Sequence, residues 1–278
     1  MLRQRVITAL ILAGALIATL LFAPYPLQAI LFALVAAAGG WEWAALVGAQ
    51  SALSRAIYAA VIPLLCGALW MGLALDGPEA ALHARPWLAA TVLLWSAMLV
   101  GLKYYSAGRG VWVHAWVRAV MGWLMLTATW LAVTVCLTLI SGPFIVFLLI
   151  LTVASADIGA YFAGRRFGQH ALAAEISPAK TWEGFWGGML CVALLATLIW
   201  QNLPLSQLHL GWGSLMVLGL ATAGASVVGD LTVSLLKREV GLKDSGSLLP
   251  GHGGLMDRLD SICGAAPVFA LGLLLIGY

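Results

Sequence analysis

Long apolar runs dominate the chain, and short polar segments separate them. A helix that crosses the hydrocarbon core of a bilayer needs about 20 predominantly apolar residues. Spans are therefore expected at Val6–Phe22, Leu27–Ala45, Ala56–Leu75, Trp87–Leu102, Ala119–Ile140, Phe144–Phe162, Phe185–Trp200, Ser214–Leu236 and Ile262–Tyr278. The pattern predicts an all-α polytopic membrane protein with about nine transmembrane helices.

The first run follows Arg3 and Arg5 and is similar to a signal peptide. Its length, Val6 to Phe22, exceeds the roughly 7–15 residues of a usual signal-peptide core, and further spans follow it. We therefore expect an uncleaved membrane anchor.

Composition agrees with a chain that faces lipid. Of 278 residues, 63% are hydrophobic and only 9% are charged, whereas soluble domains carry about 25% charged residues. This excludes a soluble enzyme, a disordered chain and a nucleic-acid-binding protein. The four cysteines lie inside apolar runs without a CxxC pair, so we interpret them as buried apolar side chains.

The cations predict an orientation. If the N-terminus is cytoplasmic, 13 of the 14 Lys and Arg residues lie on the cytoplasmic side, and Arg85 alone lies outside. The cytoplasmic set is Arg3, Arg5, Arg55, Lys103, Arg109, Arg118, Arg165, Arg166, Lys180, Lys237, Arg238, Lys243 and Arg258. Such a bias is typical of cytoplasmic loops, so we expect a cytoplasmic N-terminus and a C-terminus on the opposite side.

Polar chemistry is concentrated in the second half. Residues 1–140 are expected to form scaffold helices, in which Glu42 is the only acid in or beside a span. Residues 141–278 are expected to form the catalytic region, with cytoplasmic loops at 164–181 and 237–256. From Asp157 to Asp260 the chain holds 8 of its 11 acids and 7 of its 14 bases.

Asp157 and Asp230 lie within apolar runs, where a charge costs about 2.5–3.5 kcal/mol on insertion scales and usually faces an interior cavity. Asp230, Ser234 and Lys237 are spaced to lie on one helix face. A structural contact between helices, or an Asp–Lys ion pair, is the alternative to a functional role. For Asp157 both interpretations stay open, whereas the polar segment after Asp230 favours function there.

That segment, Ser234–Ser261, contains four cations, four acids and five glycines. Glycine lets backbone N–H groups approach an anion, and Lys and Arg neutralise phosphate. Asp257, Asp260 and Ser261 are expected on one face where the last helix begins. Carboxylates beside phosphate-binding cations suit Mg²⁺. A lipid-headgroup anchor would explain the cations alone, and helix capping would need only one aspartate.

The loop at 164–181 is similar in kind. We expect Ser177 to cap a helix with Pro178 at its first position, which places Lys180 and Thr181 in a first turn that attracts phosphate. Glu183 follows just inside the next span. A well-capped helix without a ligand is the alternative. His170 is interpreted as an isolated surface residue, and His252, among glycines, could orient a phosphate, move a proton or fill a turn.

Three motifs in residues 154–261 then resemble one family. They are ADIGAYFAGRRFG, ISPAKTWEG and a spaced pattern over Ser234–Asp260, which includes Lys237-Arg238, Lys243-Asp244, His252-Gly253-Gly254 and Asp257-Arg258. The chain thus resembles the phosphatidate cytidylyltransferase (CDP-diacylglycerol synthase) family. The N-terminal half resembles this family in hydropathy only.

The resemblance implies that CTP and phosphatidate react to CDP-diacylglycerol and pyrophosphate. It implies Mg²⁺, a homodimer, and a site on the cytoplasmic face of a bacterial inner membrane. Metal-binding aspartates match Asp230 and Asp257. The expected catalytic residues are Lys237, Arg238, Asp257, Arg258 and Asp260, and the expected substrate-binding residues are Asp157, Ser177, Lys180, Thr181, Glu183, Ser234, Lys243, Asp244, His252, Gly253 and Gly254.

Three alternatives remain. A CTP-dependent lipid-alcohol kinase would release CDP instead of pyrophosphate. An ion-coupled transporter could use Asp157 and Asp230, although transporters often have repeated halves and this chain shows no internal repeat. A lipid-binding scaffold would have no use for paired carboxylates beside a glycine-rich loop.

Overall fold

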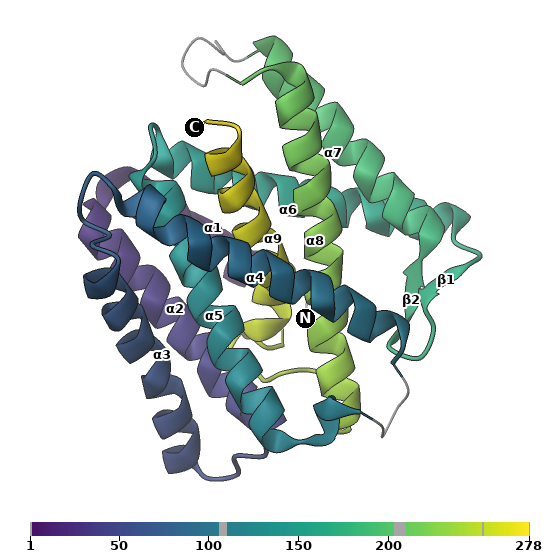
Figure 1. Cartoon of the computed structure of the whole chain (residues 1–278). Coiled ribbons are helices and arrows are strands. Elements are labelled where there is room, and N and C mark those ends of the chain that lie inside the picture. Colours follow the sequence, from purple (N-terminus) through teal and green to yellow (C-terminus); the bar gives the residue numbers. More distant parts are fainter. Residues whose placement is uncertain (1, 106–109, 203–209, 252, 278) are drawn as a thin grey trace.

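The computed structural model describes residues 2–105, 110–202, 210–251 and 253–277, and its architecture is helical (Figure 1). In this part of the chain the helices are α1 (Leu2–Phe22), α2 (Tyr25–Val47), α3 (Ala52–Gly72), α4 (Ala80–Lys103), α5 (Ala115–Thr138), α6 (Gly142–Phe167), α7 (Trp182–Asn202), α8 (Trp212–Glu239) and α9 (Met256–Leu275). The nine expected helices are therefore confirmed. Within the described residues, α2 to α9 are long and apolar enough to span a membrane, and α1 has a shorter apolar run over Val6–Phe22.

Helix ends extend beyond the apolar runs that predicted them. Helix α4 starts at Ala80 and passes through Pro86, and α9 starts at Met256 before the run that begins at Ile262. Hydropathy marks only the part of a helix that suits lipid, whereas the backbone hydrogen bonds continue through charged residues. The polar segment expected at Ser234–Ser261 therefore lies partly within α8 and α9.

The helices pack as two groups around a central helix (Figure 1). Helices α2, α3 and α5 contact one another on one side, and α6 to α8 lie on the other. Helix α9 packs against both α5 and α8, while α4 crosses in front of α8 and α9. Because α9 is central, any residue at its N-terminal end can meet residues from both groups.

Helix α1 lies at the edge of the bundle and exposes most of its apolar side chains, such as Leu10 and Phe22. Its C-terminal end is held by buried Gln28, whose amide donates hydrogen bonds to the carbonyls of Thr19, Leu20 and Ala23. These bonds satisfy carbonyl groups that a helix end leaves open.

A short antiparallel hairpin precedes α7. It consists of β1 (Ala171–Ala173) and β2 (Ser177–Thr181), with Ala171 opposite Thr181. The expected helix cap at Ser177 is therefore wrong. Proline also suits an edge strand, and Thr181 caps α7 instead, because its Oγ1 accepts the Gly184 N–H at 3.1 Å.

Further small differences concern the connections. A single 3-10 turn, η1 (Val111–Val113), precedes α5. Because α6 extends to Phe167 and α8 to Glu239, the segments between helices are 168–181 and 240–255, which are shorter than the loops expected from hydropathy.

Candidate active site

Two ion pairs connect the hairpin, α8 and α9. Lys180 of β2 pairs with Asp230 of α8, and both side chains are 27% exposed. About two turns further along α8, Lys237 Nζ lies 2.8 Å from Asp257 Oδ1 of α9. The second pair is more deeply buried, with side chains 11% and 13% exposed. The attraction between opposite charges is stronger in a partly buried pair than in water, because the effective dielectric constant is lower.

Other predicted residues join these pairs. Asp157 of α6 interacts electrostatically with Asp230, Lys180 and Arg258. Buried Asp260 of α9 interacts with Asp230, Lys237 and Lys180. Ser234 Oγ donates to Asp230 Oδ1 at 3.2 Å, as the expected α8 stripe requires. Four segments, namely α6, β2, α8 and α9, thus bring their acids and bases into one cluster.

Close packing of α8 on α9 makes this cluster possible. Gly229, next to Asp230, lies against the backbone of Asp260 and Gly264, and a Cβ at either glycine would collide with the opposite helix. Two helices whose backbones approach so closely bring the residues beside the glycines together. Asp230 and Asp260 are the residues placed in this way.

Asp257 also holds the segment before its own helix. Its carboxylate accepts the N–H groups of Ser245, at 3.1–3.2 Å, and Gly254, at 3.2 Å. Ionised acceptors make stronger hydrogen bonds than neutral ones. The same carboxylate therefore binds Lys237 and orders the 240–255 segment.

Glu42 of α2 is a further member of the site region that sequence reasoning left without a role. Only 2% of the residue is exposed. Its Oε2 accepts the Ser245 hydroxyl at 3.1 Å and the Met256 N–H at 2.8 Å, and its Oε1 accepts the Leu248 N–H at 3.2 Å. The sequence offered one signal for a role of Glu42. It is an acid alone in an apolar run, and ionisable residues in such runs usually have a functional or structural partner.

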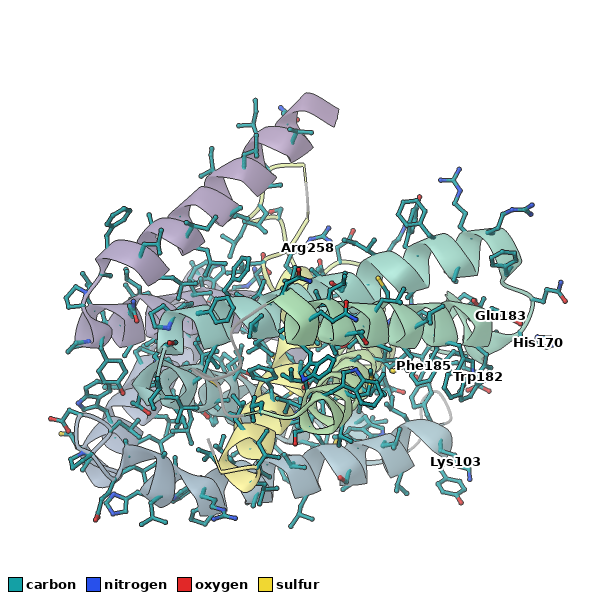
Figure 2. All side chains as sticks on the ribbon, turned by 90° about the horizontal axis from the view of Figure 1, so that it is seen from above. Lys103, His170, Trp182, Glu183, Phe185 and Arg258 are labelled. Carbon is teal, nitrogen blue, oxygen red and sulfur yellow. The ribbon has the colours of Figure 1, made fainter. Side chains whose placement is uncertain are left out.

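Glu183 points away from the cluster. Its Oε2 accepts the N–H groups of Gln169 and His170 at 3.1 and 3.3 Å, and its Oε1 lies 2.5 Å from His170 Nδ1. Figure 2 shows Glu183 and His170 side by side at the outer end of α7. His170 is exposed, as expected, but it is not isolated. This contact holds the segment that enters the hairpin.

Arg238 points to the hairpin turn. Its Nε donates to the Ile176 carbonyl at 3.2 Å. Nearby, burial raises the pKa of Tyr105 to about 12, and a hydrogen bond to Glu239 and the charge of Glu175 act in the same direction. The end of α8 therefore contacts the hairpin through Arg238, while Lys237 faces α9.

The remaining predicted residues lie around this cluster in different settings. Ser177 begins β2 opposite Ala173, Thr181 caps α7, and Lys243 and Asp244 are exposed. Gly253 accepts the Leu249 N–H through its carbonyl at 3.0 Å, and Gly254 packs against Ser245 and Glu42. His252 lies outside the described residues.

The carboxylates of the cluster suit a metal ion only together with ligands from a substrate. Among the residues that the structure describes, no three His, Cys, Asp or Glu side chains are grouped to hold an ion by themselves. Magnesium usually takes one or two carboxylates together with substrate phosphates. Asp230 fits this mode because its partners, Lys180 and Ser234, are side chains that can move. At Asp257 each carboxylate oxygen already accepts two hydrogen bonds, so an ion there would take the position that the Lys237 ammonium group now occupies.

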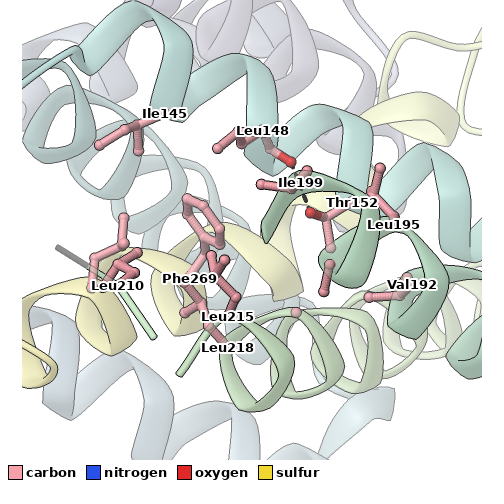
Figure 3. Close-up of a pocket in the computed structure, with 13 residues that line it drawn as sticks. Ile145, Leu148, Thr152, Val192, Leu195, Ile199, Leu210, Leu215, Leu218 and Phe269 are labelled. Carbon is pink, nitrogen blue, oxygen red and sulfur yellow. Dashed lines mark hydrogen bonds between the residues drawn. The ribbon is translucent and has the colours of Figure 1, made fainter. Parts of the chain in front are cut away.

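A separate apolar cavity lies elsewhere (Figure 3). Its walls include Ile145 near the start of α6, Leu215 near the start of α8 and Phe269 in the second half of α9. The charged cluster occupies the opposite ends of these three helices. This cavity therefore has no part in the polar site.

A family model and one of the relatives match all or nearly all of the chain, and other relatives match part of it. Residues 3–276 match the model of the cytidylyltransferase family. The chain is 38% identical over 279 aligned positions to a phosphatidate cytidylyltransferase of Pseudomonas aeruginosa, and this alignment covers 100% of the chain and 99% of the relative. It is also 42% identical to the Haemophilus influenzae protein of the same name, over 46% of the chain and 45% of that relative. A Staphylococcus epidermidis protein of that name is 44% identical over 43% of the chain and 44% of its own length.

Proposed function

The chain belongs to the cytidylyltransferase family, and on this premise we propose that it transfers the cytidylyl group of CTP to phosphatidate at the cluster of α6, β2, α8 and α9. The products are CDP-diacylglycerol and pyrophosphate, so the enzyme is a nucleotidyltransferase of phospholipid synthesis. The full-length similarity to the Pseudomonas aeruginosa enzyme supports this activity.

The observation that carries the site assignment is the presence of two ion pairs, Lys180–Asp230 and Lys237–Asp257. Each pair has one member on α8, and its other member lies on β2 or α9. Both substrates carry phosphate. Each lysine can exchange its carboxylate partner for a phosphate oxygen without leaving the cluster.

In the reaction, an oxygen of the phosphatidate phosphate attacks the α-phosphorus of CTP. A bond forms between that oxygen and the phosphorus, and the bond from the α-phosphorus to the bridging oxygen breaks, so that pyrophosphate leaves with the bonding electrons. A phosphate monoester is largely ionised near neutral pH, and no strong general base is required. Lys180, Lys237 and Arg258 stabilise the negative charge, so catalysis is mainly positioning and electrostatics.

Asp230 and Asp257 are the residues we propose to hold Mg²⁺. When bound, the ion neutralises phosphate charge and polarises the reacting phosphorus. Asp257 is kept in position by the backbone of the 240–255 segment, and Asp230 by Ser234.

The proposed setting is the cytoplasmic face of a bacterial inner membrane. CTP is a cytoplasmic nucleotide, and the lipid phosphate lies at the leaflet surface. The cluster lies at the helix ends that carry Arg165, Arg166, Lys237 and Arg238, which is the side that the positive-inside bias assigns to the cytoplasm. A homodimer is proposed from the family resemblance, and crosslinking in native membranes tests it.

The decisive experiment measures the products of purified protein supplied with CTP, phosphatidate and Mg²⁺. We expect CDP-diacylglycerol and pyrophosphate in equal amounts, and at least a roughly 100-fold lower turnover for Asp257→Asn. Asp76→Asn, an exposed acid in the segment between α3 and α4, is the matched control. Release of CDP from wild-type protein would indicate a kinase, and absence of both products would refute the proposed activity.

A further inference from the structure

We propose that Glu42 of α2 is a positioning residue for the reaction, which fixes the 240–255 segment and the first turn of α9 so that Asp257 meets Lys237. The inference rests on the proposed function, because it concerns the same site. Glu42 lies more than 200 positions before its partners in the sequence, and the motifs of the C-terminal half do not include it.

The contacts of Glu42 place its carboxylate at the start of α9. Met256 is the first residue of α9, and its N–H donates to Glu42 Oε2 at 2.8 Å. The first N–H groups of a helix have no partner within the helix, and negative charge is favourable there. Glu42 therefore caps α9 from another helix, one residue before Asp257.

Ser245 connects the two carboxylates. Its backbone N–H donates to Asp257, and its hydroxyl donates to Glu42 Oε2 at 3.1 Å. Ser245 is only 3% exposed, so neither contact competes with bulk water. A shift of Glu42 would move Ser245, and through it the carboxylate that faces Lys237.

The glycines of the segment support a close fit around Glu42. A Cβ at Gly246 would collide with Glu42 Oε1, and a Cβ at Gly254 would collide with Ser245 Oγ and Glu42 Oε2. The backbone thus wraps the carboxylate directly. A buried carboxylate is tolerable because hydrogen-bond donors surround it.

The test compares Glu42→Ala and Glu42→Gln with Gln28→Ala. Gln28 is a suitable control because it is a buried residue of the same helix, and its three hydrogen bonds go to the C-terminal end of α1 and to none of the residues that Glu42 holds. Glu42→Ala is expected to lower kcat about 100-fold, since a displacement of about 1 Å has an effect of that size. The KM for CTP should stay within about twofold, because Glu42 does not touch substrate. Gln28→Ala should lower the Tm while kcat stays near wild type.

Glu42→Gln keeps one acceptor oxygen but turns an NH₂ group toward one donor, so we expect an intermediate, roughly 10-fold loss of kcat. Hydrogen exchange in detergent gives a readout besides activity. The amides of Leu248 and Met256 should both exchange faster in Glu42→Ala, and at least one of them should do so in Glu42→Gln, because these two amides donate to different carboxylate oxygens. Both should remain protected in Gln28→Ala. Protection equal to wild type in Glu42→Gln would overturn the proposal.

A double variant tests the route through Ser245. If Glu42 acts by holding this residue, Ser245→Ala adds little to the loss caused by Glu42→Ala, since interacting residues are not additive. Fully multiplicative losses would contradict the route, as would a raised KM for CTP with unchanged kcat. If the wild type is active and Glu42→Ala is equally active, the proposal for Glu42 is refuted and the proposed function stands. If the wild type is inactive, the proposed function is refuted.

Discussion

Lys180 and Lys237 each face a carboxylate in the structure, although we assign both to phosphate. The two arrangements are compatible because an ammonium group on a flexible stem can change partners. The two aspartates compensate the charge of the lysines and hold them in the cluster. We expect incoming phosphate to reach the more exposed pair, Lys180–Asp230, with less rearrangement.

Lys180→Met should lower kcat about 100- to 1,000-fold, the usual effect of removing one group that stabilises charge in the transition state. Lys180→Arg should retain more activity because it keeps the charge. Arg165→Met is the control, since Arg165 lies exposed at the end of α6 and contacts Tyr161. Steady-state turnover of CTP measures all three. Equal losses in Lys180→Met and Arg165→Met would contradict a local role for Lys180.

Residue-scale prediction from the sequence reached the site only in part. The spacing of Asp230, Ser234 and Lys237 predicted a shared helix face, and the Asp230–Ser234 hydrogen bond agrees with it. Glu42 could not be placed, because its partners are separated from it by most of the chain. Glu183 is predicted among the substrate ligands. In the structure its carboxylate accepts the N–H groups of Gln169 and His170, a contact that the sequence did not suggest.

At the scale of elements, the hairpin brings Lys180 to α8. Its turn is tied to α8 by the Arg238–Ile176 hydrogen bond, and its entry is tied to α7 by Glu183. Hydropathy predicted the nine helices because lipid-facing runs are long and uninterrupted. The segment Ser177–Thr181 was predicted as a helix start, since Ser-Pro suits both a cap and an edge strand, and only pairing with Ala171–Ala173 decides between them.

The contact between α8 and α9 depends on glycine, and Gly264→Ala tests this. The added methyl group would meet the Ala225 carbonyl and the Gly229 backbone, so α8 and α9 must separate. We expect a lower Tm and at least a roughly 10-fold loss of turnover, because overpacking shifts backbones and Asp230 moves with α8. Gly67→Ala is the matched control in α3, where nothing lies within 4 Å of the new Cβ. Equal changes of Tm and turnover in Gly264→Ala and Gly67→Ala would refute the explanation that the close contact of α8 and α9 requires glycine.

At the scale of the whole molecule, the site draws on both parts of the chain. We propose residues 1–140 as scaffold and 141–278 as the catalytic region, with Glu42 as the contact through which the scaffold orders the catalytic segment. Helix α9 makes this possible because it packs against α5 on one side and α8 on the other. The arrangement requires that the 240–255 segment and the cluster lie on one side of the membrane.

Cysteine labelling in oriented vesicles tests that side. Ser245 lies in the middle of the segment but is buried, so the exposed Ser247 is the better position. Ser247→Cys should react with a membrane-impermeant maleimide from the cytoplasmic side only. Asp76→Cys, between α3 and α4, should react only from the opposite side. The reverse pattern would overturn the proposed orientation.

The long separation between Glu42 and Met256 also has a consequence for biosynthesis. The two residues are 214 positions apart, and chains are synthesised at about 5–20 residues per second. For roughly 10 to 40 s after α2 leaves the ribosome, its acid therefore has no access to the amides that it accepts in the finished protein. Helix α9 completes both the proposed reaction centre and the hydrogen bonds of this carboxylate, so we expect that a nascent chain becomes active only after α9 has been inserted.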